Sequence, residues 1–140
     1  MRRQRGVTLI ELMIVVVIVA IAASISVSSY RRYVMRAQRT DATTALLRAS
    51  SAQERFFLQN RRYMNAADLT AAGLDASEHG YYTIAIASPD PARPGLPGFV
   101  LTATATAGTP QAADSACATF TVNDLSDKGS APEPVATCWR

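Results

Sequence analysis

The sequence predicts an α+β fold in which a long N-terminal α-helix packs on a four-stranded antiparallel β-sheet. Three observations lead to this prediction. A nearly unbroken apolar run starts at Val7, a one-sided apolar stripe continues it to Phe57, and β-branched and aromatic segments alternate with turn residues after Gly80. The first two features predict one helix, and the hairpin-length connections between the later segments favour an antiparallel meander.

The first thirty residues combine a basic segment with a stretch long enough to cross a membrane. Residues 2–5 carry three arginines and are followed by Gly6, after which the apolar run reaches Ala23. At 1.5 Å per residue, a helix over residues 7–27 spans about 31 Å, which matches a bilayer core. Glu11 lies within this run, and a carboxylate at the centre of a membrane helix costs about 2.5–3.5 kcal/mol, so Glu11 calls for a partner.

The helix is predicted to continue to about Asn60, as a single element from Val7 that is about 80 Å long. No proline occurs before Pro89, and no glycine occurs between Gly6 and Gly73. The second half of this helix is one-sided, because a set of mostly apolar residues recurs at intervals of three, four and seven: Met35, Ala42, Leu46, Ala49, Gln53, Phe56 and Phe57.

The head after the helix is predicted to consist of strands. Four prolines make residues 89–98 a loop, because proline cannot donate a ladder hydrogen bond. Residues 123–134 are polar and predict a second loop. The segments with strand character are residues 81–86, 99–106 and 117–122, with a short fourth strand at 135–139.

The two cysteines, Cys117 and Cys138, are predicted to form a disulfide. About eighty residues remain for the head, which is a small core that benefits from a covalent link. A disulfide that closes a loop of this length contributes roughly 3 kcal/mol in the chain-entropy model. The alternative is a pair of buried free thiols; a metal site is not expected, since the sequence has no further cysteine and only one histidine.

Charge is distributed unevenly along the chain. The whole sequence has 14 basic and 11 acidic side chains, but three of the arginines precede Gly6, so the chain after Gly6 has 11 of each. Residues 31–62 carry eight arginines against two acids, whereas residues 63–140 carry three basic side chains against eight acids. The basic isoelectric point is therefore weak evidence for nucleic-acid binding.

The N-terminal segment admits three interpretations. An ordinary secretory signal would use Ala20-Ile21-Ala22, a small-x-small pattern, as its cleavage site. A plain membrane anchor explains the length of the apolar run but leaves Glu11 without a role. In a prepilin leader, both Glu11 and the glycine before the apolar run have a function.

The third interpretation rests on a resemblance. Gly6, the following sequence Val7-Thr8-Leu9-Ile10-Glu11-Leu12 and the apolar run behind it resemble the N-terminus of type IV prepilins. The resemblance implies that a prepilin peptidase cleaves between Gly6 and Val7 and that the new Val7 amine is methylated. Family members most often begin their mature chain with Phe or Met, so Val7 is a departure that bears on methylation more than on cleavage.

The resemblance also implies partners and a location. The helix is expected to wait in the inner membrane as a single pass and then to enter an extracellular filament among other pilin subunits, drawn out by the pilus assembly machinery. We expect the Glu11 carboxylate to pair with the Val7 amine of a neighbouring subunit, because pairing neutralises both charges away from water. The predicted segments are the leader 1–6, the apolar half-helix 7–30, the amphipathic half-helix 31–60 and the β head 61–140.

The head is most similar to minor pilins of the PilE type, and the match extends over essentially the whole chain. The residues that carry this likeness occur in the order Glu54-Arg55-Phe56-Phe57, Tyr63, Gly80-Tyr81-Tyr82-Thr83-Ile84, Leu101-Thr102-Ala103, Asp114, Cys117 and Cys138-Trp139. The same pattern is similar to pilins that act as DNA-uptake receptors. The resemblance implies a minor structural subunit of a type IV pilus.

Other function classes stay open at this stage. A DNA receptor would use cations predicted to lie in loops or at the terminus, namely Arg93, Lys128 and Arg140, with helix arginines adding to them. A type II secretion pseudopilin is a further alternative, although the Cys138-Trp139 ending argues against it. A secreted soluble domain would follow from the signal-peptide interpretation.

The sequence does not predict an enzyme, a cofactor or a metal site. His79 is the only histidine and has no cysteine or serine at a catalytic spacing. Asn123, Asp124 and Asp127 resemble a loose calcium loop, but they lack EF-hand spacing. Tyr81, Tyr82 and Trp139 are interpreted as packing residues, with Trp139 expected to lie against the disulfide.

Overall fold

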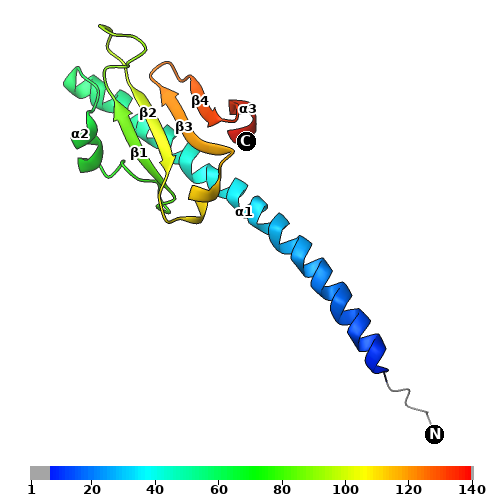
Figure 1. The fold of residues 1–140 in the computed structure, drawn as a ribbon. Coiled ribbons are helices and arrows are strands. Elements are labelled where there is room, and N and C mark those ends of the chain that lie inside the picture. Colours follow the sequence, from blue (N-terminus) through cyan, green and yellow to red (C-terminus); the bar gives the residue numbers. More distant parts are fainter. Residues whose placement is uncertain (1–6, 140) are drawn as a thin grey trace. The chain divides into compact units, whose positions relative to one another are not determined.

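The computed structural model describes residues 7–139. They form two compact units with a boundary between Val34 and Met35. The helix α1 (Leu9–Asn60) supplies nearly all of the described first unit and the long helix of the second (Figure 1). The helix predicted from Val7 to Asn60 is therefore confirmed to within two residues.

In the second unit, α1 presents its predicted apolar face to the core. Ala42, Leu46, Ala49 and Gln53 are fully buried, whereas Leu47 on another side of the helix is about half exposed. The buried positions are spaced by three or four residues, which places them along one stripe of a helix. The Gln53 side chain is satisfied in part by accepting a hydrogen bond from the backbone amide of Met64 at 2.8 Å.

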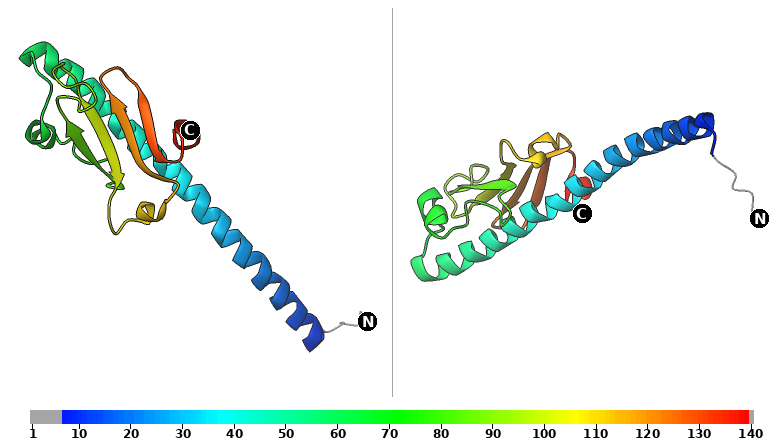
Figure 2. Two further views of the ribbon diagram at one scale, coloured as in Figure 1. Left: turned by 45° about the horizontal axis from the view of Figure 1, so that its top comes forward. Right: turned by 90° about the horizontal axis from the view of Figure 1, so that it is seen from below.

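The sheet lies along this stripe of α1, as two views of the second unit show (Figure 2). Its strand order is β1-β2-β3-β4 and every neighbouring pair is antiparallel. The α+β fold class and the four-stranded antiparallel sheet are therefore confirmed. The strands are β1 (Tyr82–Ala87), β2 (Val100–Ala105), β3 (Cys117–Asn123) and β4 (Lys128–Pro132).

The register of the strands builds the inner layer of the core. Ile84 lies opposite Ala103, which in turn lies opposite Phe120, and all three side chains are buried. The residues between them on each strand are more exposed, as expected for a sheet covered on one face only. Tyr82, fully buried, meets Phe120 edge to face with their ring centroids 5.7 Å apart.

The prediction of the fourth strand was wrong in its position. The fourth strand is β4, inside the segment 123–134 that the sequence predicts as a loop. Residues Val135–Cys138 instead form the short helix α3, with Pro134 as its N-cap residue. A proline fixes φ near the helical value and has no amide hydrogen to donate, so Pro134 is compatible with the start of a helix.

Two short helices complete the second unit. The helix α2 (Ala66–Ala71) was not predicted, although it begins with a reciprocal cap: Asn65 accepts a hydrogen bond from the Asp68 amide, and Asp68 accepts one from the Asn65 amide. Such a pair satisfies two amides that a helix start leaves unpaired. The 3₁₀-helix η1 (Pro110–Ala113) lies between β2 and β3.

The C-terminal end is fixed to β3 by the predicted disulfide, which is confirmed. Cys117 and Cys138 are joined, with their Cα atoms 5.7 Å apart. Trp139 contacts the sheet: its ring meets Phe120 edge to face at 6.1 Å and its indole nitrogen donates to the carbonyl oxygen of Gly129 at 2.8 Å. Trp139 is thus a packing residue whose ring contacts Phe120 of β3 and whose indole nitrogen bonds to β4.

Candidate functional sites

The first candidate site is the start of α1. The Glu11 amide donates a hydrogen bond to the Thr8 hydroxyl at 3.3 Å, so Thr8 acts as a cap for the first helical turn. Glu11 itself lies in that turn, where the positive end of the helix dipole favours a carboxylate. Val7 precedes the helix and is 71% exposed, while Gly6, the other residue of the predicted cleavage site, lies outside the described residues.

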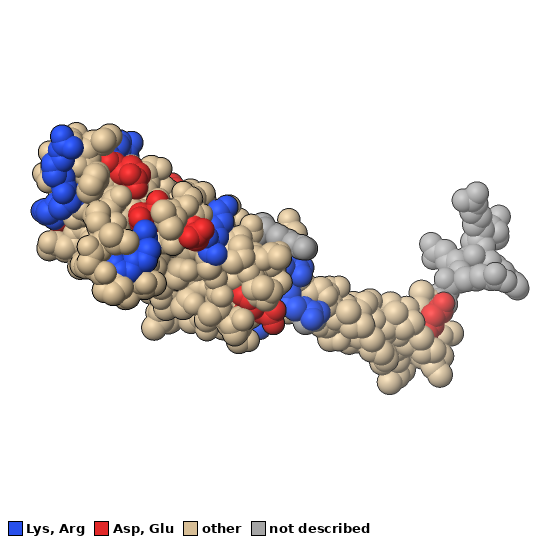
Figure 3. Space-filling view, turned by 90° about the horizontal axis from the view of Figure 1, so that it is seen from above, with Lys and Arg blue, Asp and Glu red and all other residues tan. Residues whose placement is uncertain are grey.

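The N-terminal unit exposes its apolar side chains on all sides. Figure 3 shows this stretch as an almost continuous surface of uncharged side chains. The most apolar window in α1 has a mean hydropathy of 2.8, and among residues 7–139 this is the one helix long and apolar enough to cross a membrane. Such a surface is stable only when lipid or other protein covers it.

The second candidate site is the set of cations expected to contact DNA, namely Arg93, Lys128 and Arg140. The structure places Arg93 in the β1–β2 loop, where its side chain is 26% exposed and pairs with two acids. Its Nε atom donates to Asp90 at 3.0 Å, and its Nη2 atom donates to Asp124 in the β3–β4 connection. The pKa of Asp90 is lowered by the hydrogen bond from the Ala92 amide and then by that from Arg93.

These contacts give Arg93 a structural role. The charge of its guanidinium is compensated by two carboxylates, which leaves less of it for a phosphate. A Cβ added at Gly98 would lie 2.7 Å from the Nη2 atom of Arg93, so a side chain at this position would require the Arg93 guanidinium to shift. Arg93 therefore joins the two loops.

The other two predicted cations have different surroundings. Lys128 is the first residue of β4 and so does not lie in a loop, which corrects the sequence prediction. Its ammonium nitrogen is 5.0 Å from the centroid of the Trp139 ring, a cation–π contact. Arg140 lies outside the described residues. Arg93 and Lys128 thus have separate sets of partners on different elements.

An open pocket at the end of α1 gathers cations more directly. It has a volume of about 350 Å³ and is lined by Arg61, Arg62, Tyr63, Asn65, Ser88, Pro89, Pro97 and Gly98. The Arg62 guanidinium donates to Asp68 at 2.6 Å and lies over the Phe56 ring at 5.0 Å. Arg61 is exposed and forms no ion pair with any residue from 7 to 139, so its charge is free for a ligand.

Tyr63 gives this pocket a rigid wall. Its ring stacks on Phe57 with centroids 4.6 Å apart and meets Phe99 edge to face at 4.9 Å. Burial is the main cause that raises the pKa of the Tyr63 hydroxyl. Proteins that bind single-stranded nucleic acids stack bases on aromatic rings beside cationic side chains, and the same combination also occurs in purely structural clusters.

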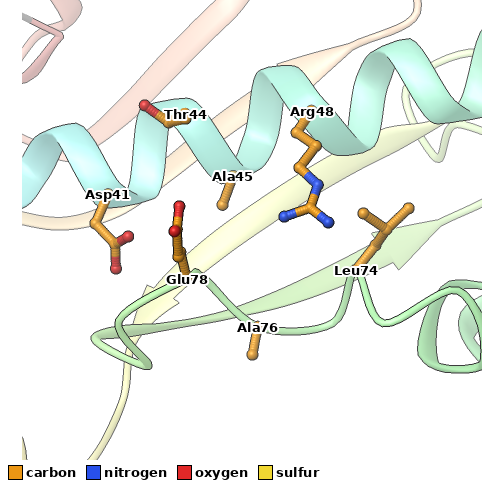
Figure 4. A pocket seen from close by; sticks show the side chains of 7 residues that line it. All are labelled: Asp41, Thr44, Ala45, Arg48, Leu74, Ala76 and Glu78. Carbon is orange, nitrogen blue, oxygen red and sulfur yellow. The ribbon is translucent and has the colours of Figure 1, made fainter.

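A smaller pocket of about 40 Å³ lies between α1 and the segment before β1 (Figure 4). The side chains of Asp41, Arg48 and Glu78 point into it from the two elements. Asp41 is bound by His79, whose Nδ1 atom lies 3.0 Å from the Asp41 Oδ1 atom. The hydrogen bond to Asp41 is the main cause that raises the pKa of His79.

These contacts give His79 a structural role in the turn before β1. The His79 side chain is 65% exposed, and its ring stacks on the Tyr81 ring with the centroids 5.9 Å apart. Asn123 and Asp127 bond to each other within the β3–β4 connection, and Asp124 pairs with Arg93. Within residues 7–139, no three His, Cys, Asp or Glu side chains are grouped closely enough to hold a metal ion.

The fold and the exposed helix define the class of protein. A long apolar helix without a covering partner, followed by a disulfide-linked head on a four-stranded sheet, is the arrangement of a type IV pilin. A family model described as type IV minor pilin ComP, DNA uptake sequence receptor, matches residues 28–121, and the prokaryotic N-terminal methylation motif matches residues 1–27. The chain belongs to this family of type IV minor pilins.

Individual relatives include a type IV major pilin and fimbrial proteins. The chain is 35% identical over 86 residues to the type IV major pilin protein PilA of Myxococcus xanthus. The matched segment covers 61% of this chain and 39% of the relative. It is 38% identical over 97 residues to a fimbrial protein of Moraxella nonliquefaciens, covering 66% of this chain and 61% of the relative. A fimbrial protein of Pseudomonas aeruginosa is 39% identical over 67 residues, with 48% and 44% covered. The chain thus matches less than two thirds of the length of each.

Proposed function

We propose that this chain is a minor structural subunit of a type IV pilus, which is assembled into the filament or primes its assembly through the N-terminal helix. The observation that carries the proposal is the apolar surface of residues 7–27, which is exposed on all sides and contains one acid, Glu11. A soluble helix does not need the exposed apolar surface, and a plain membrane anchor does not need the carboxylate of Glu11. A bundle of subunit helices covers the apolar surface and supplies Glu11 with a partner.

In this proposal the subunit passes through two stages, one in the membrane and one in the filament. It is held by a single pass in the inner membrane with the basic leader on the cytoplasmic side, in agreement with the positive-inside rule. The prepilin peptidase then cuts between Gly6 and Val7, where a glycine offers no side chain to obstruct the enzyme, and the Val7 amine is methylated. The assembly machinery moves the mature chain into the extracellular filament among other pilins.

Glu11 has a defined task in the second stage. Its carboxylate pairs with the Val7 amine of a neighbouring subunit as the helices bundle. The position of Glu11 in the first helical turn supports this role, because the carboxylate and the N-terminus of the same helix lie only one turn apart. A neighbouring helix shifted by about one turn can therefore bring its own amine to this carboxylate.

Mass spectrometry of the mature N-terminus in sheared filaments tests the proposal. We expect chains that begin at a methylated Val7. A Gly6 substitution by a large residue should leave the leader attached and keep the chain in the membrane. Chains that begin near residue 23 would support the secretory interpretation instead, and recovery of the protein only from a type II secretion complex would support the pseudopilin alternative.

A second candidate function is DNA-uptake recognition, and one specific observation favours it. The matching family is described as a DNA uptake sequence receptor, and that match covers residues 28–121, which include the pocket at the end of α1. Arg61 is the pocket's unpaired cation, and the Tyr63 ring forms its wall. Against this function stands the acidic head, in which Arg93 is already paired with Asp90 and Asp124.

Titration of duplex DNA into the soluble head at low and at moderate salt decides between the two functions. If the pocket binds DNA, Arg61→Gln should weaken binding and reduce the salt dependence by about one phosphate contact. Lys128→Gln and Arg140→Gln test two of the cations that the sequence associates with DNA, and Arg55→Gln on an exposed turn of α1 is the matched control. An absence of binding even at low salt would reject the receptor function and leave the assembly role.

A further inference from the structure

Four consecutive residues at the end of the apolar stretch form a collar around α1. They are Tyr30, Arg31, Arg32 and Tyr33, which we call the collar. Successive residues of an α-helix are rotated by about 100°, so four in a row point in four directions around the helix. Both tyrosines are about two thirds exposed, and both arginines are exposed as well.

The collar has no partner within the described chain. Neither Arg31 nor Arg32 forms an ion pair or a side-chain hydrogen bond with any residue between 7 and 139, and the hydroxyls of Tyr30 and Tyr33 are likewise unbonded. The preceding residues 12–29 contain no charged side chain. Figure 3 shows the change from uncharged to basic surface along this helix. Charge and aromatic rings therefore appear together, directly where the apolar surface ends.

This pattern matches the chemistry of a membrane surface. Tyrosine rings are enriched at the headgroup level, where one end of the ring is in hydrocarbon and the hydroxyl is in water. Arginine presents a planar fork of donors that fits phosphate oxygens. We propose that the collar binds the phosphates of anionic lipids at the outer surface of the bilayer while the subunit awaits assembly. The proposal rests on the membrane stage of the proposed function.

The distribution around the helix favours lipid over other anions. A protein partner or a DNA duplex approaches a helix from one side and is met by a stripe of residues three and four positions apart. The two rings of the collar lie on one side of the helix and its two guanidiniums on the other, so the four side chains together encircle the helix, which suits a medium that surrounds it. A neighbouring acidic subunit can take over these arginines later, when the lipid has been left behind.

The collar also fixes the depth of Glu11. Tyr30 follows Glu11 by 19 positions, and the helix is continuous between them, so at 1.5 Å per residue they are about 29 Å apart. This distance is close to the thickness of the hydrocarbon core of about 30 Å. With the collar at one headgroup layer, the carboxylate of Glu11 reaches the opposite layer. It is then hydrated, and it does not bear the cost of a charge at the bilayer centre.

Lipid association of the full chain tests the proposal. The chain is reconstituted in phosphatidylcholine vesicles that contain spin-labelled phosphatidylglycerol or spin-labelled phosphatidylcholine as a probe, and the motionally restricted fraction of each probe is compared. We expect the wild-type chain to prefer phosphatidylglycerol. Arg31→Gln with Arg32→Gln should reduce the preference by about fivefold for each arginine at low ionic strength. Added salt should produce a similar loss.

Two matched double variants test whether the preference depends on the charge of the arginines and on their position in the collar. Arg48→Gln with Arg55→Gln removes the same charge from exposed positions in the head half of α1 and should leave the preference unchanged. Arg31→Lys with Arg32→Lys keeps the charge, and this variant should retain most of the preference for phosphatidylglycerol. The arginines before Gly6 contribute equally to all of these chains.

The outcomes separate the inference from the function on which it rests. If the chain remains with the vesicles but both double glutamine variants keep the same phosphatidylglycerol preference as the wild type, the collar is not a lipid site and the membrane stage stands. If the wild-type chain is removed from the vesicles by washing, both the inference and the membrane stage are overturned.

Discussion

Arg39 and Asp114, separated by 75 positions in the sequence, form a buried two-pronged ion pair. The Arg39 Nε and Nη2 atoms donate to the two carboxylate oxygens of Asp114 at 2.7 and 2.9 Å, and the side chains are 10% and 3% exposed. Gln111 extends this contact by donating to Asp114 at 3.1 Å and to the backbone oxygen of Met35 at 3.3 Å. The connection between β2 and β3 is thereby attached to α1.

Replacing Asp114 by Ala should strongly destabilise the head. The change leaves the Arg39 guanidinium buried without a carboxylate, and breaking such a pair typically costs about 3–5 kcal/mol. The free energy of unfolding is measured by urea denaturation of a soluble fragment that comprises residues 31–140. Glu54→Gln, at an exposed and unpaired position of α1, is the control and should have an effect within about 0.5 kcal/mol. A similar loss in both variants would contradict the structural role of the pair.

Removal of the disulfide should lower stability by a comparable amount. The bond between Cys117 and Cys138 closes a loop with a sequence separation of 21, for which the chain-entropy model gives roughly 3 kcal/mol. In the same fragment, replacing both cysteines by Ser should therefore lower the melting temperature by on the order of 15 °C. The wild-type fragment under reducing conditions should show a similar fall, and an unchanged melting temperature in both cases would refute this estimate.

The elements with a strong local signal were predictable from the sequence. The buried stripe of α1 followed from its helical spacing, and β1 to β3 followed from their aromatic and β-branched residues. The fourth strand was missed because Lys128–Pro132 contains a glycine, a serine and a proline, which have low strand propensity. Its pairing with β3 and the bond from Trp139 hold it in the sheet, and neither contact is visible locally.

The charged contacts of the head were not predictable for a related reason. Arg93 could be recognised as a cation in a loop, but its two carboxylate partners are brought to it by the fold of two separate loops. The same holds for His79 and Asp41, which are 38 positions apart. A local sequence pattern identifies which groups are charged, whereas the tertiary structure decides which of them remain available for a ligand.

The contact between His79 and Asp41 predicts a dependence of stability on pH. Hydrogen bonding to Asp41, together with the nearby charges of Asp41 and Glu78, raises the pKa of His79 above its ordinary value of 6.5. A group with a raised pKa in the folded state stabilises the fold fully below its unfolded pKa, and this contribution is lost as the pH rises through the folded value. The turn before β1 should therefore be held most tightly below pH 6.5.

Urea denaturation of the soluble fragment on both sides of this pH range measures the effect. The wild-type midpoint should fall as the pH rises above 6.5, and His79→Gln should remove this part of the pH dependence. The control is Glu133→Gln, which also changes an exposed titratable group but lies far from the turn in sequence. An identical pH profile for His79→Gln and the wild type would exclude His79 as the titrating group.

The last prediction concerns Glu11 and separates membrane insertion from assembly. Glu11→Gln keeps the length of the side chain and its place in the first helical turn while it removes the charge. We expect normal amounts of this variant in the membrane fraction, because an uncharged amide in place of the carboxylate adds no cost to insertion. Its amount in sheared filaments should fall by about tenfold, which corresponds to a loss of about 1.4 kcal/mol from the pairing with the Val7 amine.

Quantitative immunoblots of both fractions provide the measurement. Glu54→Gln removes an equal charge from an exposed position of the head half of α1 and should enter filaments normally, which excludes a general effect of net charge. Glu11→Asp retains the carboxylate and should restore part of the incorporation, with the remaining loss due to its shorter reach. Filament levels of Glu11→Gln equal to those of the wild type would show that the carboxylate is not needed for assembly, because the variant differs from the wild type in that single charge.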